Sequence, residues 1–562
     1  MKINDRKHLI FIALLLIGIF IGSFRTLGDN DIWFQLLAGK YFIEHGSVPH
    51  TDFFLYVGQG NPQQFGGWGF GVMYEWVISI FGLSSATYLN STIWCASFFF
   101  AIKAAAARSN TRFSTLTIQQ LLVLDILTSI VFIASSSRMS MRAESTLVFS
   151  WTLSLWLFEK AKRRDTLMSF WLTLPLIGWA EAMLHTGGFV LLTILPICYA
   201  MSITGASSWR RNLGGWIACA IALAILPSIN PNGVEQVYVQ LIDIIKSMMP
   251  HSKVVVQGVN LEYLPIWDAR ASAMIPPYLL LVLLGVFICF NKRSRVCAVE
   301  NIICVAFLVL AAIHNRGISL AAMVLMVPSF QLAFSNSFDK LRFPRLLAGC
   351  IFIVLCAVPL GGSYVVNNFG IQSAKTAYDF EIAKIRKTHP NGAHIFTTEN
   401  GPALAYAFHD ERFLVSKGGH PLIQNRDAEI HHSLVVNSED GWESEMEKQH
   451  VDFVCMPLYL PLPGQGIFFW LPSMLASNSE WKSHIGSGTC NLFERIQDGN
   501  KLNENEVKFQ TMTYLQNLAI FSEATFYGQP DVIGQEIGRK AKENYDKLNE
   551  ELKEKASDDK KH

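Results

Sequence analysis

The stretch GDNDIWFQLLAGKYFIEHGSVPHTDFF, residues 28–54, directly follows an apolar run that is long enough to cross a membrane. It presents two carboxylates, Asp29 and Asp31, beside a pair of aromatic residues. The apolar run before it, 9–24, follows three basic residues and lacks a small-x-small cleavage site, so we interpret it as a retained membrane anchor. What the two acids do depends on the side of the membrane on which they lie and on the residues that accompany them.

The composition indicates a membrane protein with many spans. Of the 562 residues, 51% are hydrophobic and only 16% are charged, which is too apolar for a water-soluble chain of this length. The net charge of +1, from 46 basic and 45 acidic residues, gives no support to nucleic-acid binding. Most of the ten cysteines lie in apolar runs and need no chemistry. Cys455 and Cys490 lie in a more polar region, where they could pair if it is extracytoplasmic or remain two buried thiols.

Eleven apolar runs have the length that a bilayer demands. They cover residues 8–24, 84–105, 115–135, 144–159, 166–183, 187–204, 213–229, 276–291, 297–313, 317–334 and 346–366. The segment 69–83 is short and carries Glu75, so we expect an interfacial or re-entrant helix there, with a twelfth span as the alternative.

The distribution of basic residues assigns sides to the loops. Lys and Arg gather in alternate loops, which belong on the cytoplasmic side together with the N-terminus. Two of these loops hold Lys103, Arg108 and Arg112, and then Lys160, Lys162, Arg163 and Arg164. The remaining loops, including 25–83 and everything after residue 366, are then extracytoplasmic.

The texture of the sequence changes after residue 366. Short β-rich runs broken by Gly, Pro and Asp alternate with helical stretches, which predicts an extracytoplasmic α/β domain over 367–499. From residue 500 to 562 the chain is helical and charged, and a break at GQP, 528–530, predicts a helical hairpin with a solvated tail. Residues 1–366 form the transmembrane domain. The α/β region holds several histidines without the ligand spacing of a closed zinc site, namely His394, His409, His420, His431 and His432.

Charged residues gather at the predicted outer ends of the spans. They are Arg138, Arg142, Glu144, Glu181, His185, Glu262, His314 and Arg316. Such charges normally face a protein interior or a wet cavity, although snorkelling and helix capping explain single cases. A carboxylate can take a proton from an attacking hydroxyl or hold a divalent cation, while arginine and histidine stabilise a departing phosphate. The set therefore suits glycosyl transfer from a lipid phosphate at the outer membrane surface.

The order of these motifs resembles the GT-C superfamily of integral membrane glycosyltransferases, most closely bacterial members whose first outer loop opens with D-x-D-x-W-W/F. The matching residues are Asp29, Asp31, Trp33, Phe34, Gly39, Gly46, Pro49, Asp52 and Phe53. R-A-E at 142–144, L-H-T-G-G at 184–188, E-Y-L-P at 262–265 and N-R at 315–316 are similar to later motifs of the family. Where relatives often carry H-E-W, this chain has GGWG at 66–69, so either Glu75 replaces the missing acid or the chemistry is altered or lost.

The resemblance implies a role for each matching residue. Asp31 is the preferred catalytic base or metal-positioning carboxylate, Asp29 supports it, and Glu144 is the second carboxylate. The donor phosphate would be bound by Arg142, Arg316 and His185. Candidates for substrate contact are Trp33, Asp52, Trp68, Glu75, Glu262 and Tyr263. A divalent cation, Mg²⁺ or Mn²⁺ held by Asp31 and Glu144, is the one cofactor expected.

The resemblance implies an inverting glycosyltransferase of the bacterial cytoplasmic membrane. It would transfer a sugar from a polyprenyl-phosphate-linked donor to a glycan, lipid or protein acceptor on the extracytoplasmic face. Two alternatives remain: a ligase or polymerase of lipid-linked oligosaccharides, and a non-catalytic scaffold or transporter of envelope assembly that binds a protein partner through its C-terminal helices. The enzyme readings require Asp31, Arg142, Glu144 and Arg316 to line one cavity.

Overall fold

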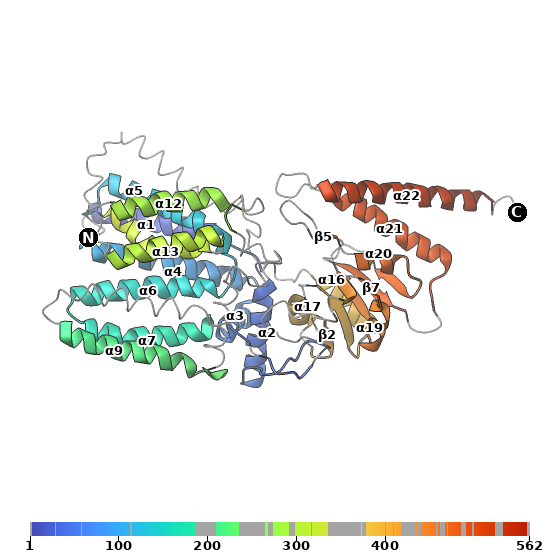
Figure 1. Ribbon diagram of the computed structural model, residues 1–562, viewed down its shortest axis with the longest axis horizontal. Helices are drawn as coiled ribbons and strands as arrows, with labels where there is room; N and C mark the ends of the chain where they lie inside the picture. The colour runs from blue at the N-terminus through green and yellow to red at the C-terminus, as the bar shows by residue number, and fades with distance from the viewer. Residues whose placement is uncertain are drawn as a thin grey trace. The chain divides into compact units, whose positions relative to one another are not determined.

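The structure is a computed structural model of the whole chain (Figure 1). It describes residues 3–27, 30–57, 59–63, 65–112, 115–185, 209–234, 265–267, 274–290, 298–315, 317–334, 373, 378–398, 401–408, 410–416, 431, 434–436, 438, 440–456, 459–460, 467–468, 470–484, 490–496, 500–522 and 532–558. The chain divides into two compact units. The first comprises Met1–Val48 and Phe65–Ala374, and the second comprises Pro49–Gln64 and Lys375–His562.

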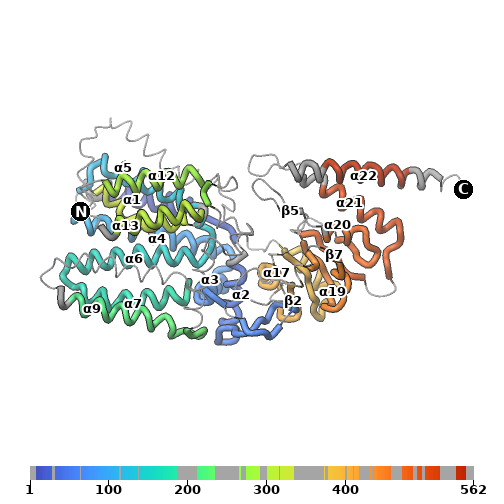
Figure 2. Tube along the Cα trace, in the orientation of Figure 1, coloured from blue at the N-terminus to red at the C-terminus, as the bar shows by residue number. Residues whose placement is uncertain are grey.

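The first unit is a bundle of helices. In chain order they are α1 (Ile3–Gly22), α2 (Asn30–His45), α3 (Trp68–Phe81), α4 (Ser85–Arg108), α5 (Ile118–Ser135), the 3₁₀ turn η2 (Ser136–Arg138), α6 (Glu144–Arg163), α7 (Leu167–Leu184), α9 (Trp209–Ile225), the 3₁₀ turn η3 (Leu226–Ser228), α12 (Ile275–Phe290), α13 (Ala298–Ile313) and α14 (Gly317–Ala333). Helices α6, α7 and α9 run side by side (Figure 2).

Nine of the eleven predicted apolar runs coincide with helices of this bundle, and the other two, 187–204 and 346–366, lie outside the described residues. Among the described helices, α4, α5 and α7 are long and apolar enough to cross a membrane. The prediction of a membrane protein agrees with this, whereas the total of eleven spans stays a prediction.

Helix α14 lies at the centre of the bundle. All but one of its residues are buried, and it packs against α4, α5, α12 and α13. Its sequence, GISLAAMVLMVPSFQLA, has no charged residue on any face. A helix that is apolar all round is stable only when it is surrounded, which explains its central place.

The second unit is built on a five-stranded sheet. Its strands are β1 (Ala393–Thr397), β2 (Phe413–Val415), β3 (Phe453–Met456), β6 (Trp481–His484) and β7 (Asn491–Arg495), in the order β2-β1-β3-β7-β6. Strand β1 is parallel to β2 and β3, and β7 is antiparallel to β3 and β6. Strands β4 (Tyr459–Leu460) and β5 (Ile467–Phe468) form a separate antiparallel pair. The predicted α/β character of this region is therefore seen, with a disulfide between Cys455 and Cys490.

Helices accompany the sheet of the second unit. They are α16 (Asp379–Thr388), α17 (Gly401–Phe408), α19 (Trp442–Lys448) and α20 (Trp470–Ala476), followed by α21 (Glu504–Ser522) and α22 (Val532–Asp558). Helices α21 and α22 pack on each other as a helical hairpin. Gln510 of α21 is buried, and its amide donates to the carbonyl oxygens of Ala476 and Trp481, both at 3.0 Å. These bonds attach the hairpin to the sheet.

The first outer loop contributes an edge to this sheet. Val415 N donates to Phe54 O at 2.9 Å, and Tyr56 N donates to Val415 O at 3.1 Å, so residues 54–56 pair with β2. The loop segment Pro49–Gln64 thus belongs to the second unit, although it is far from the rest of that unit in the sequence.

Candidate active site

The start of α3 contacts the end of α7 through glycines. A Cβ added to Gly69 would lie 2.9 Å from the carbonyl oxygen of Met183, and one added to Gly67 would lie 3.2 Å from that of Leu184. Gly67 also has a φ of 70°, a left-handed conformation that side chains disfavour. The stretch in which relatives often carry an acid is therefore shaped for glycine in this chain.

Asp31 lies in the first turn of α2, one turn before Gln35. Gln35 Nε2 is 3.1 Å from the Cβ position of Gly67, which in turn approaches Leu184 at the end of α7. Gln35, one turn after Asp31, therefore lies near the end of α7, where His185 follows. The side chain of Asp31 lies outside the described part of the chain.

Three other candidates pack around α2 and α3. Trp33 is buried, and its Nε1 donates to Leu27 O at 3.2 Å. Trp68 is buried with its ring 5.4 Å from that of Phe42. Glu75 is buried on α3, and its negative charge acts on Lys40 of α2. These contacts give each of the three candidates a role in packing, and their contact with substrate stays a prediction.

Glu181 is bound by hydroxyl groups at the junction of α6 and α7. It is fully buried, and its carboxylate accepts from Thr146 Oγ1 at 3.1 Å and from Ser150 Oγ at 2.7 Å. The backbone N–H of His185 donates to Glu181 O at 2.7 Å, which ends α7. This network fixes the end of α7 against the first two turns of α6.

An ion pair joins η2 to the first turn of α6. Arg138 Nη1 lies 3.7 Å from Glu144 Oε2, with the side chains only 7% and 15% exposed. Arg138 is therefore buried beside a carboxylate that is only slightly exposed. Between them, the half-buried Arg142 precedes α6, and its carbonyl accepts from Ser145 Oγ at 2.9 Å.

The sequence analysis missed two residues that anchor this segment. Asn90 Nδ2 donates to Met139 O at 2.8 Å, and Tyr74 OH donates to Asn90 Oδ1 at 3.4 Å. Both Asn90 and Tyr74 are completely buried. An asparagine inside the apolar run of α4 is a signal that could have identified the first of them, because a buried amide needs partners.

Asp52 belongs to the second unit, where it shapes the docked loop. Its Oδ1 accepts from Phe54 N at 3.1 Å and from Leu55 N at 3.0 Å, and only 2% of the residue is exposed. Burial raises the pKa of this carboxyl to about 7, against the two backbone hydrogen bonds, which lower it. The turn that it forms directs residues 54–56 to β2.

Tyr56 lies at the centre of a buried polar cluster in the same unit. Its hydroxyl is 2.9 Å from His431 Nε2, and His431 Nδ1 is 3.3 Å from Glu445 Oε1. The ring of Tyr56 stacks on His394 at 5.0 Å. Burial lowers the pKa of His431, while Glu445 raises it. Two of the histidines in this region thus hold the docked loop in place.

Several of the predicted site residues lie in parts of the chain that the structure does not describe. Asp29, Arg316, Glu262 and Tyr263 lie outside the described residues. Among the described residues, no group of three or more His, Cys, Asp or Glu could hold a metal ion. Glu144 lies beside Arg138. The predicted Mg²⁺ or Mn²⁺ stays a prediction.

Comparison with known proteins identifies the fold. No protein-family model matches the sequence, and no curated protein matches it. The crystal structure of the Archaeoglobus fulgidus oligosaccharyltransferase tethered with an acceptor peptide containing the NVT sequon aligns with a TM-score of 0.52 and 13% identity, covering 88% of this chain and 75% of that chain. The apo form of that enzyme aligns with a TM-score of 0.50 and 11% identity, covering 92% and 79%.

The chain shares the fold of this oligosaccharyltransferase. The predicted GT-C-like architecture agrees with this shared fold, since the alignment includes most of both chains. The bacterial subgroup and its D-x-D-x-W opening stay predictions, because the solved relatives are archaeal.

Proposed function

We propose that this protein is a GT-C-type membrane glycosyltransferase that transfers a sugar or oligosaccharide from a polyprenyl-phosphate-linked donor to an acceptor on the extracytoplasmic face. The observation that carries the proposal is the meeting of charged groups at one end of the bundle. Arg138, Arg142 and Glu144 lie at the start of α6, and Glu181 and His185 lie at the adjacent end of α7. Gln35, one turn after Asp31, lies near the same end of α7.

The reaction needs a base for the acceptor's proton and a site that binds the departing phosphate. An acceptor O–H or N–H attacks the anomeric carbon from the face opposite the phosphate, and the bond from that carbon to the phosphate oxygen breaks. Asp31 or Glu144 would take the acceptor's proton, and the lipid phosphate leaves with the bonding electron pair. Arg142 and His185 would stabilise the negative charge that grows on the phosphate.

The donor and acceptor classes follow from the fold likeness and remain part of the proposal. The solved relative is an oligosaccharyltransferase, and its acceptor is a peptide. We therefore favour an oligosaccharide donor and a protein acceptor over a single sugar and a glycan. The scaffold or transporter alternative lacks such support, since it does not require carboxylates and cations to converge.

The test is transfer by the purified full chain in detergent with extracted polyprenyl-linked saccharides and a panel of acceptors that includes an NVT peptide. We expect Asp31→Asn and Glu144→Gln each to reduce transfer about 100-fold or more, the range in which a lost general base falls. Asp165→Asn is the matched control, because Asp165 is an exposed acid at the other end of α6 with a left-handed φ of 53° that asparagine also tolerates.

The outcomes separate the alternatives. Unchanged transfer in Asp31→Asn would remove Asp31 from the mechanism and move the assignment to Asp29 or Glu75. No transfer by the wild-type chain with any donor would support a scaffold. Loss of transfer on chelation, with recovery on adding Mg²⁺ or Mn²⁺, would support the predicted cation.

A further inference from the structure

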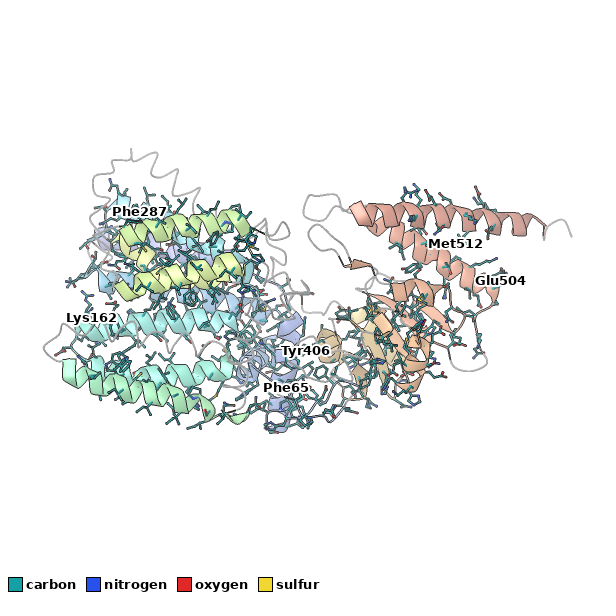
Figure 3. The ribbon with its side chains drawn as sticks, viewed as in Figure 1. Phe65, Lys162, Phe287, Tyr406, Glu504 and Met512 are labelled. Carbon is teal, nitrogen blue, oxygen red and sulfur yellow. A yellow bond between two sulfur atoms is a disulfide. The ribbon has the colours of Figure 1, made fainter. Side chains whose placement is uncertain are left out.

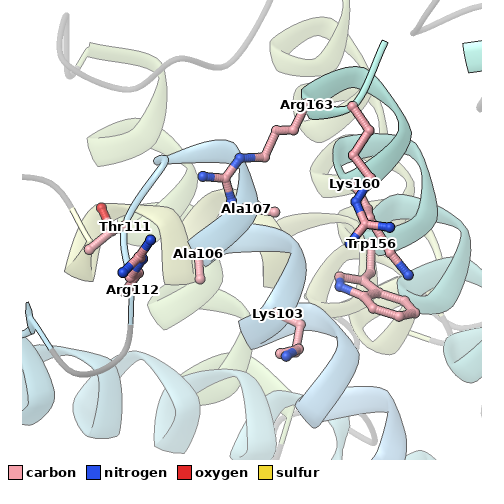
Figure 4. Close-up of a pocket in the computed structure, with 9 residues that line it drawn as sticks. Lys103, Ala106, Ala107, Thr111, Arg112, Trp156, Lys160 and Arg163 are labelled. Atoms are coloured by element: carbon pink, nitrogen blue, oxygen red, sulfur yellow. The ribbon is translucent and has the colours of Figure 1, made fainter. Parts of the chain in front are cut away.

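A cavity of about 440 Å³ opens between the ends of α4 and α6, at the end of α6 opposite Glu144 (Figure 4). Helix α4 ends at Arg108 and α6 ends at Arg163, so the last turns of both helices form its walls. Cations from the two walls line it, namely Lys103, Arg112, Lys160, Arg163 and Arg164. It is separate from the candidate active site.

The lining of the cavity carries positive charge. None of its nine lining residues is acidic. Among the described residues, Arg112, Lys160, Arg163 and Arg164 have no carboxylate partner, and Arg163 bonds the amide oxygen of Asn110. Like charges that line one cavity repel one another unless an anion lies between them.

Arg108, at the end of α4, is a cation with a structural role. It is nearly buried, and it lies 2.8 Å from Glu159 and 2.9 Å from Glu300. Both acids thus pair with Arg108. Two general effects explain why Lys and Arg occur in these loops. The negative ends of the two helix dipoles attract them, and positive residues are retained on the cytoplasmic side of the membrane. Neither effect requires five cations to share one cavity.

An aromatic track continues from the cavity along the same pair of helices. Lys160 Nζ lies 4.8 Å from the centre of the Trp156 ring, which also lines the cavity. The ring of Phe100 lies 5.2 Å from Trp156 and 5.8 Å from Phe149, and all three side chains are partly exposed. The track extends towards the middle of α6, away from the charged end. A cationic pocket followed by apolar side chains matches an amphiphile.

We propose that this cavity binds the phosphate group of an anionic phospholipid, with an acyl chain along Phe100, Phe149 and Trp156. Basic pockets between membrane helices on the cytoplasmic side suit such head groups, and the lysine and arginine loops are predicted to lie on that side. A free phosphate shares the head-group chemistry, but it would leave the aromatic track without a ligand.

The experiment uses the delipidated full chain in detergent, titrated with dioleoylphosphatidylglycerol while bound lipid is counted by native mass spectrometry. We expect Lys160→Gln and Arg112→Gln each to weaken phosphatidylglycerol binding about five-fold, the usual worth of one cation at an anionic membrane surface. Lys162→Gln is the matched control, because Lys162 lies on the same turn of α6, is exposed and does not line the cavity (Figure 3). It should bind like the wild type.

Further arms distinguish the two sources of phosphate. Dioleoylphosphatidylcholine should bind weakly. Trp156→Leu should weaken the binding of phosphatidylglycerol, but millimolar inorganic phosphate should compete with the lipid as well as it does in the wild type. If inorganic phosphate binds as well as the lipid and Trp156→Leu has no effect, the site is for a free phosphate and the lipid assignment is overturned. If Lys160→Gln and Arg112→Gln bind phosphatidylglycerol like Lys162→Gln, the site itself is overturned. These cations are partly or fully exposed, so both variants should keep the fold, which size-exclusion chromatography checks.

Discussion

Gly39 of α2 and Gly71 of α3 place the two helix backbones in direct contact. A Cβ added to Gly39 would lie 2.2 Å from the carbonyl carbon of Gly71, and one added to Gly71 would lie 1.8 Å from the carbonyl oxygen of Gln35. No rotamer relieves such an overlap, because both partners are backbone atoms. The contact fixes the turn of Asp31 relative to the start of α3.

Gly71→Ala should therefore destabilise the first unit. Overpacking a core usually costs about 1–3 kcal/mol, and we expect the upper end because the helices must separate. The apparent melting temperature in detergent and the monodisperse fraction measure the effect. Gly214→Ala in α9 is the control, since a Cβ there meets no atom within 4 Å and alanine favours a helix. Equal behaviour of the two variants would contradict the close approach of α2 and α3.

Arg138 and Glu144 should stabilise the fold as a pair. Removing one partner leaves the other charge buried, so we expect Arg138→Gln and Glu144→Gln to lower stability by a sum that exceeds the loss in the double variant. The coupling free energy should be roughly 0.5–3 kcal/mol. Thermal unfolding of the four proteins in one detergent gives this value. If the two single variants' losses of stability simply add, Arg138 and Glu144 do not act as a pair, and Arg138 is better explained as a snorkelling side chain.

The helices of the first unit could be predicted from the sequence because crossing a bilayer dictates both the length and the apolar character of a segment. The pairing of residues 54–56 with β2 could not, since a short edge contact between distant segments depends on how the whole chain folds. The shape of the GGWG stretch at 66–69 could not be predicted either. The sequence shows that an acid is missing there, whereas only the structure shows that Gly67 has a left-handed φ and that Gly69 contacts the backbone of α7.

The candidate site was predictable in part. The motif at 142–144 and the first two residues of the motif at 184–188 lie on adjacent helix ends, because α6 and α7 pack side by side. Patterns of residue types did not reveal that Glu181 is bound by Thr146 and Ser150, since hydroxyl groups carry no distinctive spacing. In the sequence, the basic loops indicate only the side of the membrane on which they lie. Their convergence on one cavity depends on the packing of α4 against α6.

Asp52 should make the docking of the first loop dependent on pH. The pKa of Asp52 is raised to about 7 by burial, whereas an aspartate in an unfolded chain titrates near pH ~4. Between these values the folded state binds the extra proton, so the docked loop is most stable below about pH 4 and loses stability as the pH rises through about 7. Hydrogen exchange of the amides in 49–64, corrected for the intrinsic rate, should show weaker protection at pH 8 than at pH 5.

Asp52→Asn is the variant that isolates this effect. An asparagine Oδ1 can accept the same two hydrogen bonds from Phe54 N and Leu55 N without burying a charge. Protection of 49–64 should then be nearly equal at the two pH values and higher than in the wild type at pH 8. Asp546→Asn, an exposed position on α22, should retain the wild-type dependence. If a steep loss of protection between pH 5 and pH 8 survives in Asp52→Asn, Asp52 is not its cause.

The disulfide between Cys455 and Cys490 reports on the side of the membrane where the second unit lies. The bond closes a separation of 35 residues beside β3 and β7, and replacing both cysteines with serine should cost about 3–4 kcal/mol in the stability of that unit. Because such bonds persist only in oxidising compartments, we expect the pair to be oxidised in intact expressing cells. Rapid alkylation before lysis, followed by peptide mass spectrometry with and without reduction, measures this state. Two alkylated thiols in the folded protein would place the second unit in the cytoplasm, and the proposed transfer on the outer face would then be wrong.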